Sequence, residues 1–176
     1  CFLFAQYHHS AMKHVGNVRK LLGTRTIFNL LGPLTNPADA KRQLIGVYDS
    51  NHLEMIAKCL FKLNAIKAKV IHSADGLDEV SLFDKTEVIE LLNGKIIHYD
   101  FDPSDYFNIS NASLNDIKVD SIDESLDMFY SVINNEDSTA KNISILNSAF
   151  ILTIANDDIS IKEAIKECKN VVEKLV

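Results

Sequence analysis

The run Gln43-Leu44-Ile45-Gly46-Val47-Tyr48 decides the fold, together with the segments that follow it. Its apolar, β-prone residues predict a buried strand, and Asp49-Ser50-Asn51 then supplies residue types that begin helices. Asn51 and Glu54 have the spacing of a capping box, and apolar residues recur at helical spacing as far as residue 61. A second apolar, β-prone run covers residues 68–72. Strand, helix and strand in this order predict a β-α-β unit with two parallel strands.

The segments on either side of this unit extend the same architecture. Residues 86–91 and 95–101 predict two strands joined at Asn93-Gly94, a strong hairpin signal. Residues 103–120 are polar and predict a loop. Three helices should finish the chain; the second is apolar nearly all round and so should be buried, and the third has a capping box at Ser160 and Glu163. Upstream, residues 1–5 predict a strand and residues 9–22 a helix.

These elements predict one α/β domain over residues 1–176, with a mixed, largely parallel central sheet flanked by helices. The length is sufficient for one domain with a sizeable core, and 47% hydrophobic with 24% charged residues is typical of a globular protein. The net charge of −6 argues against non-specific nucleic-acid binding. No apolar run is long enough to cross a bilayer, so we expect no membrane partner. Three cysteines without a CxxC pair indicate a reducing, cytoplasmic location.

The predicted helix over residues 9–22 carries the first group of candidate ligand-binding residues. Met12, Gly16 and Arg19 lie near one stripe of it, because a turn contains 3.6 residues. The gap at Gly16 beside a guanidinium could admit a flat ligand with a carboxylate, which arginine binds through two parallel hydrogen bonds. A solvated basic helix face with an incidental glycine explains the same residues, and both interpretations stay open at this point.

Two further segments are candidates for a site. Gly32 and Pro33 lie in a cluster of helix breakers and predict a turn, which could line a pocket or be purely structural. Asp75-Gly76-Leu77-Asp78-Glu79 follows a predicted strand, where α/β sheets place their ligands. Asp78 and Glu79 offer hard oxygen ligands suited to Mg²⁺ that also holds phosphate, although an acidic surface turn would look the same. No P-loop, G-x-G-x-x-G or G-x-S-x-G segment occurs.

Three stretches together resemble the anthranilate phosphoribosyltransferase family. The most specific is Arg25-Thr26-Ile27-Phe28-Asn29-Leu30-Leu31-Gly32-Pro33-Leu34-Thr35-Asn36-Pro37; Asp75-Gly76-Leu77-Asp78-Glu79 and Leu146-Asn147-Ser148-Ala149 match as well, and the resemblance covers almost the whole chain. It implies transfer of the phosphoribosyl group of phosphoribosyl pyrophosphate (PRPP) to the amine of anthranilate, in tryptophan biosynthesis. It also implies a small helical domain beside the α/β domain, and a homodimer that associates through the helical domain.

The resemblance assigns roles to individual residues. It implies that Arg19 contacts the anthranilate carboxylate and that Asp78 and Glu79 ligate Mg²⁺. Gly32 and Pro33 match a turn near the anthranilate channel, and His9 matches a histidine beside that channel. The family has Pro at two positions where this chain has Ser10 and Asn17, which puts the local helix path and pocket shape in doubt. The family's PRPP-binding segments lie upstream and are absent from this chain, so we expect the isolated chain to be inactive.

Three alternative functions remain at this stage. A pyrimidine nucleoside phosphorylase would share the fold superfamily, but the run over residues 25–37 disfavours it. A non-catalytic relative that binds nucleic acid would need a basic groove, against which the net charge of −6 argues. A domain kept only for protein interaction would show no ligand at Arg19 or Asp78.

Overall fold

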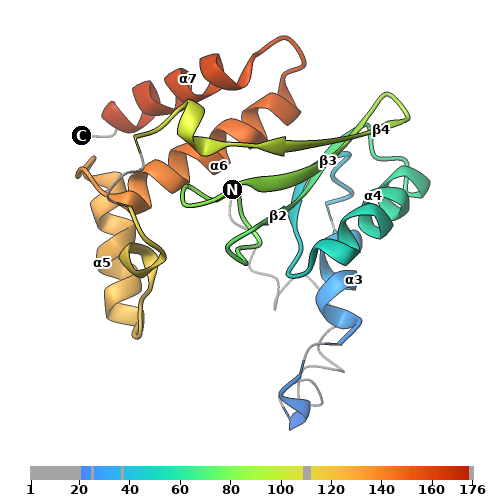
Figure 1. Cartoon of the computed structure of the whole chain (residues 1–176), viewed down its shortest axis with the longest axis horizontal. Coiled ribbons are helices and arrows are strands. Elements are labelled where there is room, and N and C mark those ends of the chain that lie inside the picture. Colours follow the sequence, from blue (N-terminus) through green and yellow to red (C-terminus); the bar gives the residue numbers. More distant parts are fainter. Residues whose placement is uncertain (1–20, 25, 37, 109–111, 175–176) are drawn as a thin grey trace. The chain divides into compact units, whose positions relative to one another are not determined.

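The computed structural model describes residues 21–24, 26–36, 38–108 and 112–174, which fall into two units, Cys1–Lys41 and Arg42–Val176 (Figure 1). The first contains α3, Phe28–Leu34, with Pro33 inside the helix. The turn predicted at Gly32 and Pro33 is therefore wrong. Pro33 lacks an N–H and removes one intrahelical hydrogen bond, but the helix ends one residue later, where the Thr35 N–H donates to the carbonyl of Leu31 at 3.1 Å.

The second unit is built on a four-stranded sheet in the order β1-β2-β3-β4. The strands are β1, Arg42–Gly46; β2, Lys67–Ser73; β3, Thr86–Leu92; and β4, Lys95–Phe101. β1 and β2 are parallel, whereas β2, β3 and β4 pair antiparallel. The predicted mixed sheet is confirmed, with one parallel pair among the described strands rather than a parallel majority. The difference arises because both later connections reverse the chain, and Asn93 (φ 51°) and Gly94 (φ 75°) form the predicted hairpin turn.

One face of the sheet is covered by α4, Leu53–Lys62, which connects the parallel strands β1 and β2. Its buried residues Leu53, Ile56 and Leu60 lie on one side of the helix, as the predicted periodicity required. The predicted capping box of Asn51 and Glu54 is wrong. A short 3₁₀ turn, Ser50–His52, precedes α4, and the Asp49 carboxylate accepts the Asn51 N–H at 3.0 Å. Glu54 instead pairs with Lys58 one turn along the helix, at 2.7 Å.

The opposite face packs against the C-terminal helices α6, Thr139–Ala155, and α7, Ile161–Glu173 (Figure 1). Side chains of Ile71, Val88 and Phe101, on successive strands, point to this face because strand residues alternate between faces. They meet Leu146, Ala149 and Phe150 of α6, all fully buried, and the buried state of α6 is confirmed. Each such leucine or phenylalanine contributes about 1.5–3 kcal/mol of hydrophobic stabilisation. This core anchors α6 firmly beneath the sheet.

The remaining elements flank this core. The segment predicted as a loop contains two 3₁₀ turns, Pro103–Asp105 and Leu114–Ile117. Helix α5, Ile122–Ile133, follows, and none of its residues is buried. The capping box of α7 is confirmed: the Ser160 N–H donates to the Glu163 carboxylate at 3.0 Å and the Glu163 N–H donates to the Ser160 hydroxyl at 3.3 Å. None of the described helices is long and apolar enough to span a membrane.

Candidate functional site

The candidate site lies in the loop over residues 74–85, which connects β2 to β3. β1 ends at Gly46 and β2 ends at Ser73, and these strands are parallel, so their carboxyl ends lie at one edge of the sheet. In α/β sheets this edge is where ligands bind. The loop carries Asp75, Asp78 and Glu79 away from the end of β2 and returns through the buried residues 80–82. The acidic segment is therefore anchored at both ends by the core.

A buried cluster of hydroxyl groups fixes the base of the loop. The Ser73 hydroxyl donates to the carbonyl of Glu79 at 2.6 Å, and the Ser73 and Thr86 hydroxyl oxygens lie 2.7 Å apart. The backbone N–H of Ser81 donates to the Ser73 hydroxyl at 3.1 Å. Ser73, Ser81 and Thr86 are all fully buried. Because each unpaired polar group would cost about 1–3 kcal/mol here, the cluster holds the Glu79 backbone in one place.

Asp75 supports the loop from within. Its carboxylate accepts the N–H of Leu77 at 3.1 Å and also accepts the Ser81 hydroxyl. Gly76 turns the chain between them with φ of 95°, a conformation that other residues rarely adopt. Both carboxylate oxygens of Asp75 are thus used by the loop itself. The three neighbouring carboxylates of the sequence divide into one that shapes the loop and two, Asp78 and Glu79, that are left for a ligand.

Asp78 and Glu79 are both exposed at the outer part of the loop. Partial burial of its carboxyl group, with a smaller effect from the negative charge of Asp78, raises the pKa of Glu79. Two adjacent carboxylates repel each other, and a bound cation would relieve that repulsion. A Cβ added at Gly46 would overlap with the carbonyl carbon and oxygen of Asp78, so the end of β1 touches this backbone directly. The backbone of the loop is therefore fixed at Glu79 by the Ser73 hydroxyl and packed at Asp78 against Gly46.

The donor set fits a hard divalent cation such as Mg²⁺. Carboxylate oxygens are its preferred protein ligands, and Mg²⁺ usually keeps several waters and binds substrate phosphates through one or two carboxylates. Within the described residues, no group of three or more His, Cys, Asp or Glu side chains could hold a metal by itself. The pair formed by Asp78 and Glu79 therefore suits a cation that is shared with a phosphorylated substrate, and not a closed structural metal site.

The other predicted site residues belong to the first unit or lie outside the described residues. Gly32 and Pro33 lie in the last turn of α3, in the first unit. His9 and Arg19 lie outside the described residues. Of the residues to which the family resemblance assigns a role, Asp78 and Glu79 share one described loop.

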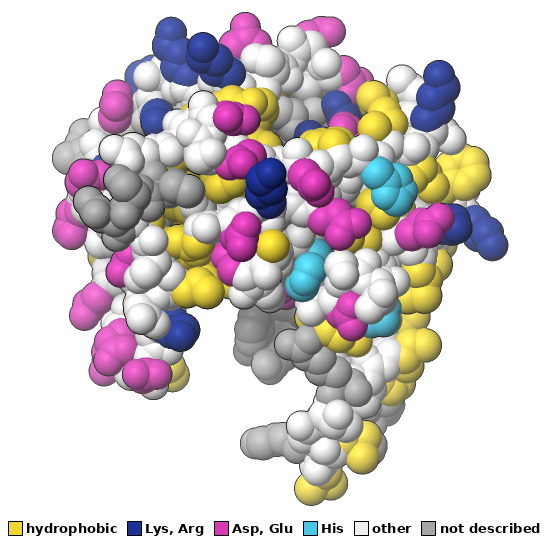
Figure 2. Space-filling view, in the orientation of Figure 1, with side chains coloured by type: hydrophobic (Ala, Val, Ile, Leu, Met, Phe, Trp, Pro, Cys, Tyr) yellow, Lys and Arg dark blue, Asp and Glu magenta, His cyan; other side chains and the backbone are white. Residues whose placement is uncertain are grey.

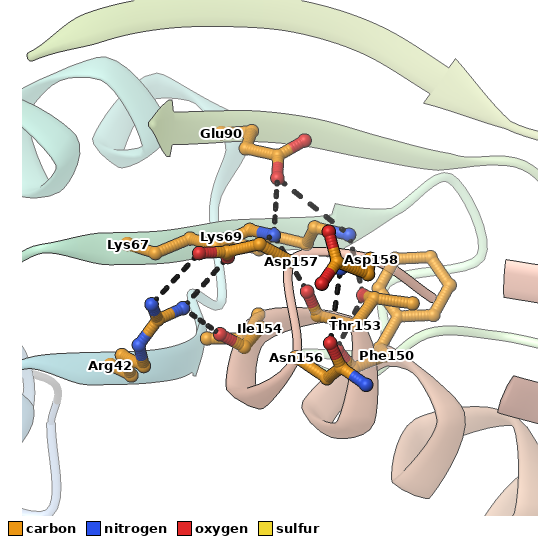
Figure 3. Close-up of polar contacts among 10 residues, drawn as sticks. All are labelled: Arg42, Lys67, Lys69, Glu90, Phe150, Thr153, Ile154, Asn156, Asp157 and Asp158. Carbon is orange, nitrogen blue, oxygen red and sulfur yellow. Dashed lines mark hydrogen bonds and ion pairs between the residues drawn. The ribbon is translucent and has the colours of Figure 1, made fainter. Parts of the chain in front are cut away.

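A buried cluster of charged residues at the opposite end of β2 was missed by the sequence analysis (Figure 3). Lys67 and Lys69 are each only 8% exposed in their side chains, beside Glu90 of β3 at 14%. The Lys69 ammonium donates to the Thr153 hydroxyl at 2.8 Å, and the Lys67 ammonium donates to the Thr153 carbonyl at 2.7 Å. Their nitrogens lie 3.9 and 4.0 Å from Glu90 Oε1. Burial lowers the pKa of Lys69, only partly offset by the charge of Glu90.

Asp157, in the turn between α6 and α7, completes this cluster (Figure 3). Its carboxylate accepts two hydrogen bonds from the Arg42 guanidinium, at 2.9 and 3.0 Å, and lies 3.2 Å from the Lys67 ammonium. The hydrogen bonds from Arg42, with a smaller effect from the one donated by Lys67, hold the pKa of Asp157 far below its usual range. Asp157 lies in an exposed turn, and its ion pairs with Arg42 and Lys67 tie that turn to the sheet. One feature of the sequence indicates part of this cluster: Lys67 and Lys69 are two residues apart on one strand, so their side chains point to the same face of the sheet.

A family model described as glycosyl transferase family, a/b domain, matches residues 1–174. The chain belongs to this family. Among curated proteins, the anthranilate phosphoribosyltransferase of Hydrogenovibrio crunogenus is 42% identical over 171 residues, which are 97% of this chain and 50% of that protein. This chain spans about half the length of the curated relatives that it matches.

Solved structures agree with the family assignment. The anthranilate phosphoribosyltransferase of Thermus thermophilus superposes with a TM-score of 0.84 at 32% identity, over 99% of this chain and 51% of that one. The Saccharomyces cerevisiae enzyme in complex with PRPP and Mg superposes with a TM-score of 0.82 over 95% of this chain and 48% of that one. Its 23% identity shows the fold alone. The resemblance of this glycosyl transferase a/b domain to anthranilate phosphoribosyltransferases, first seen in its motifs, is confirmed.

Proposed function

We propose that the chain is the C-terminal α/β half of an anthranilate phosphoribosyltransferase. The complete enzyme would transfer the phosphoribosyl group of PRPP to the amine of anthranilate, a step of tryptophan biosynthesis. The observation that carries this proposal is the exposed pair Asp78 and Glu79, held rigidly at the carboxyl edge of the sheet, in a glycosyl transferase domain. Residues 1–176 would form one domain, and the helical domain and the PRPP-binding segments would precede it.

Asp78 and Glu79 would hold Mg²⁺ in this enzyme. When bound, Mg²⁺ neutralises negative charge that develops on the pyrophosphate leaving group. The two carboxylates are exposed, and so they are accessible to a phosphorylated substrate. Because the backbone of Glu79 is already fixed by Ser73, little conformational entropy is lost when the ligand binds. The complex of the Saccharomyces cerevisiae enzyme with PRPP and Mg supports the choice of cation.

Anthranilate would be bound by residues of the N-terminal part of the chain. Arg19 would bind its carboxylate through two parallel hydrogen bonds, with His9 beside the channel and Gly32 and Pro33 lining it. Such binding would orient the aromatic amine toward the anomeric carbon of the ribose. Positioning of this kind can lower a reaction barrier by several kcal/mol. The amine needs no protein nucleophile or general base, so the proposed roles are binding and orientation.

Kinetics of variants in the complete enzyme test these assignments. Asp78→Asn and Glu79→Gln should each raise the Mg²⁺ concentration for half-maximal rate by roughly tenfold or more, since each removes a charged ligand. Arg19→Ala should raise the KM for anthranilate by about tenfold to a hundredfold, because it removes charged hydrogen bonds to the substrate. It should leave the KM for PRPP unchanged. Equal effects of Arg19→Ala on both substrates would refute its assignment, and an unaltered Mg²⁺ requirement would refute that of the acidic pair.

The alternatives predict different behaviour in the same assays. A pyrimidine nucleoside phosphorylase would consume uridine or thymidine with phosphate and would ignore anthranilate. A nucleic-acid-binding relative would need a basic groove, whereas the face in view in Figure 2 mixes acidic side chains with Lys and Arg and the net charge is −6. We further propose that the complete enzyme is a cytoplasmic homodimer that associates through its helical domain, and that this chain alone is inactive.

A further inference from the structure

The side chain of Asn147, on α6, is bonded to the backbone next to the acidic pair. Its Oδ1 accepts the N–H of Val80 at 2.9 Å, and its Nδ2 donates to the carbonyl of Val80 at 3.0 Å. Val80 directly follows Glu79 and is fully buried. The amide of Asn147 thus satisfies both backbone groups of one loop residue, as a neighbouring strand would. This contact joins segments 67 residues apart in the sequence.

Only an amide side chain can make this contact in full, since it offers a donor and an acceptor side by side. A second donor hydrogen of Nδ2 bonds the carbonyl of Ile143, one turn back on α6, at 3.0 Å. That bond fixes the orientation of the Asn147 amide. The neighbours Leu146 and Ala149 are fully buried in the core, so the helix beneath the amide has no room to shift. Asn147 is therefore a rigid support for the loop.

Three contacts together fix the backbone on both sides of the acidic pair. Gly46 touches the carbonyl of Asp78, the Ser73 hydroxyl bonds the carbonyl of Glu79 at 2.6 Å, and Asn147 bonds the next residue, Val80. Of these, Asn147 alone reaches the loop from a helix, across the core. Without it the Val80 N–H and carbonyl would be buried and unpaired, and the loop would have to move to satisfy them.

We propose that Asn147 is a positioning residue that orients Asp78 and Glu79 for a divalent cation. This inference rests on the proposed function, because it takes the pair to be the cation ligands. Asn147 acts through the backbone and contacts neither carboxylate. Groups that orient metal ligands typically change metal affinity by about 10- to 100-fold when they are removed. Asn147→Ala should therefore weaken cation binding, although it removes no ligand.

Binding of Mn²⁺ to the complete enzyme, with free Mn²⁺ followed by its electron paramagnetic resonance signal, tests this inference. Mn²⁺ is a suitable probe because it takes the same oxygen ligands as Mg²⁺. Asn147→Ala should raise the Mn²⁺ dissociation constant by about tenfold or more. Asn142→Ala is the matched control: it is the same substitution on α6, at a side chain with no hydrogen bond to another described residue, and should leave the constant unchanged. Asp78→Asn is the reference for direct loss of a ligand.

Two further measurements separate positioning from a general structural role. Thermal unfolding identifies the temperature range over which each variant stays folded, and Mn²⁺ binding is measured within that range. If Asn147→Ala does not fold, Asn147→Asp replaces it, since it keeps the acceptor for the Val80 N–H and loses both donated bonds; it should also weaken Mn²⁺ binding. A folded Asn147 variant that binds Mn²⁺ as tightly as the natural protein overturns the inference. If Asp78→Asn also binds Mn²⁺ normally, the proposed metal pair is wrong as well.

Discussion

The substitution Gly46→Ala should disrupt the candidate site by adding a single methyl group. A Cβ at this position would overlap with the carbonyl carbon and oxygen of Asp78. Neither backbone can move away easily. Gly46 is paired with Ile71 in the parallel ladder, and the loop is bonded to the Ser73 hydroxyl and the Asn147 amide. The substitution must therefore break either strand pairing or the supports of the loop.

The magnitude follows from the nature of this obstacle. Extra methyl groups in well-packed cores typically cost about 1–3 kcal/mol, when neighbouring side chains can rotate to make room. At Gly46 the obstacle is backbone, so we expect the upper end, about 3 kcal/mol. For a protein of this size each kcal/mol lowers the melting temperature by roughly 2–4 °C, which gives a decrease of about 6–12 °C. Mn²⁺ affinity should fall with it, because Asp78 is displaced.

Thermal unfolding followed by circular dichroism, with and without Mn²⁺, measures both effects. Gly32→Ala is the matched control. It lies in α3, and an added Cβ meets no described residue of its own unit within 4 Å, so its melting temperature should not fall. A Gly46→Ala protein with the stability and Mn²⁺ affinity of the natural protein would refute the close contact between β1 and the acidic loop.

Three further predictions concern the charged cluster around Lys67 and the core. Asp157→Asn should destabilise the protein at pH 6, because folding lowers the pKa of Asp157. The stability that the ionised carboxylate contributes is fully present above its unfolded pKa of about 3.9, and it is lost as the pH falls through the folded pKa. The difference in urea midpoint from the natural protein should shrink toward pH 2, and a constant difference would contradict the ion pairing. Glu90→Gln should lower the free energy of unfolding by about 3 kcal/mol, because it leaves two buried ammonium groups without their shared carboxylate. Lys69→Met should lower it by less than about 1 kcal/mol. Equal losses in urea unfolding would contradict this asymmetry. Leu146→Ala should cost about 2–5 kcal/mol, since the side chain is fully buried, and a smaller loss in the same assay would show a looser core.

Local signals in the sequence were sufficient for much of the fold. The hairpin at Asn93-Gly94 and the capping box of Ser160 and Glu163 are both confirmed, because each depends on residues only a few positions apart. The capping box predicted at Asn51 and Glu54 failed for a local reason too. Asp49, two residues earlier, competes successfully for the Asn51 N–H and begins a 3₁₀ turn instead.

Contacts between distant segments could not be predicted in the same way. Asp157 pairs with Arg42, 115 residues away in the sequence. Such a pairing exists only once the turn between α6 and α7 has been placed against the sheet. The alternation of Lys67 and Lys69 could have suggested a shared face, but not that a helix would bury it.

The candidate site shows the same division. Asp78 and Glu79 were predicted together because they are adjacent and follow a strand, and the structure places them at the expected edge of the sheet. The sequence could not separate Asp75 from them, since its role depends on the folded path of its own loop. The supports at Gly46 and Asn147 come from other elements, so only the three-dimensional structure reveals them.

The fluorescence of anthranilate in the presence of the complete enzyme, PRPP and Mg²⁺ tests the proposed phosphoribosyl transfer. The signal should decay only when protein, PRPP and Mg²⁺ are all present, and omission of any one of them should abolish the decay. A folded protein that leaves anthranilate fluorescence constant with all three components present would contradict the proposed function.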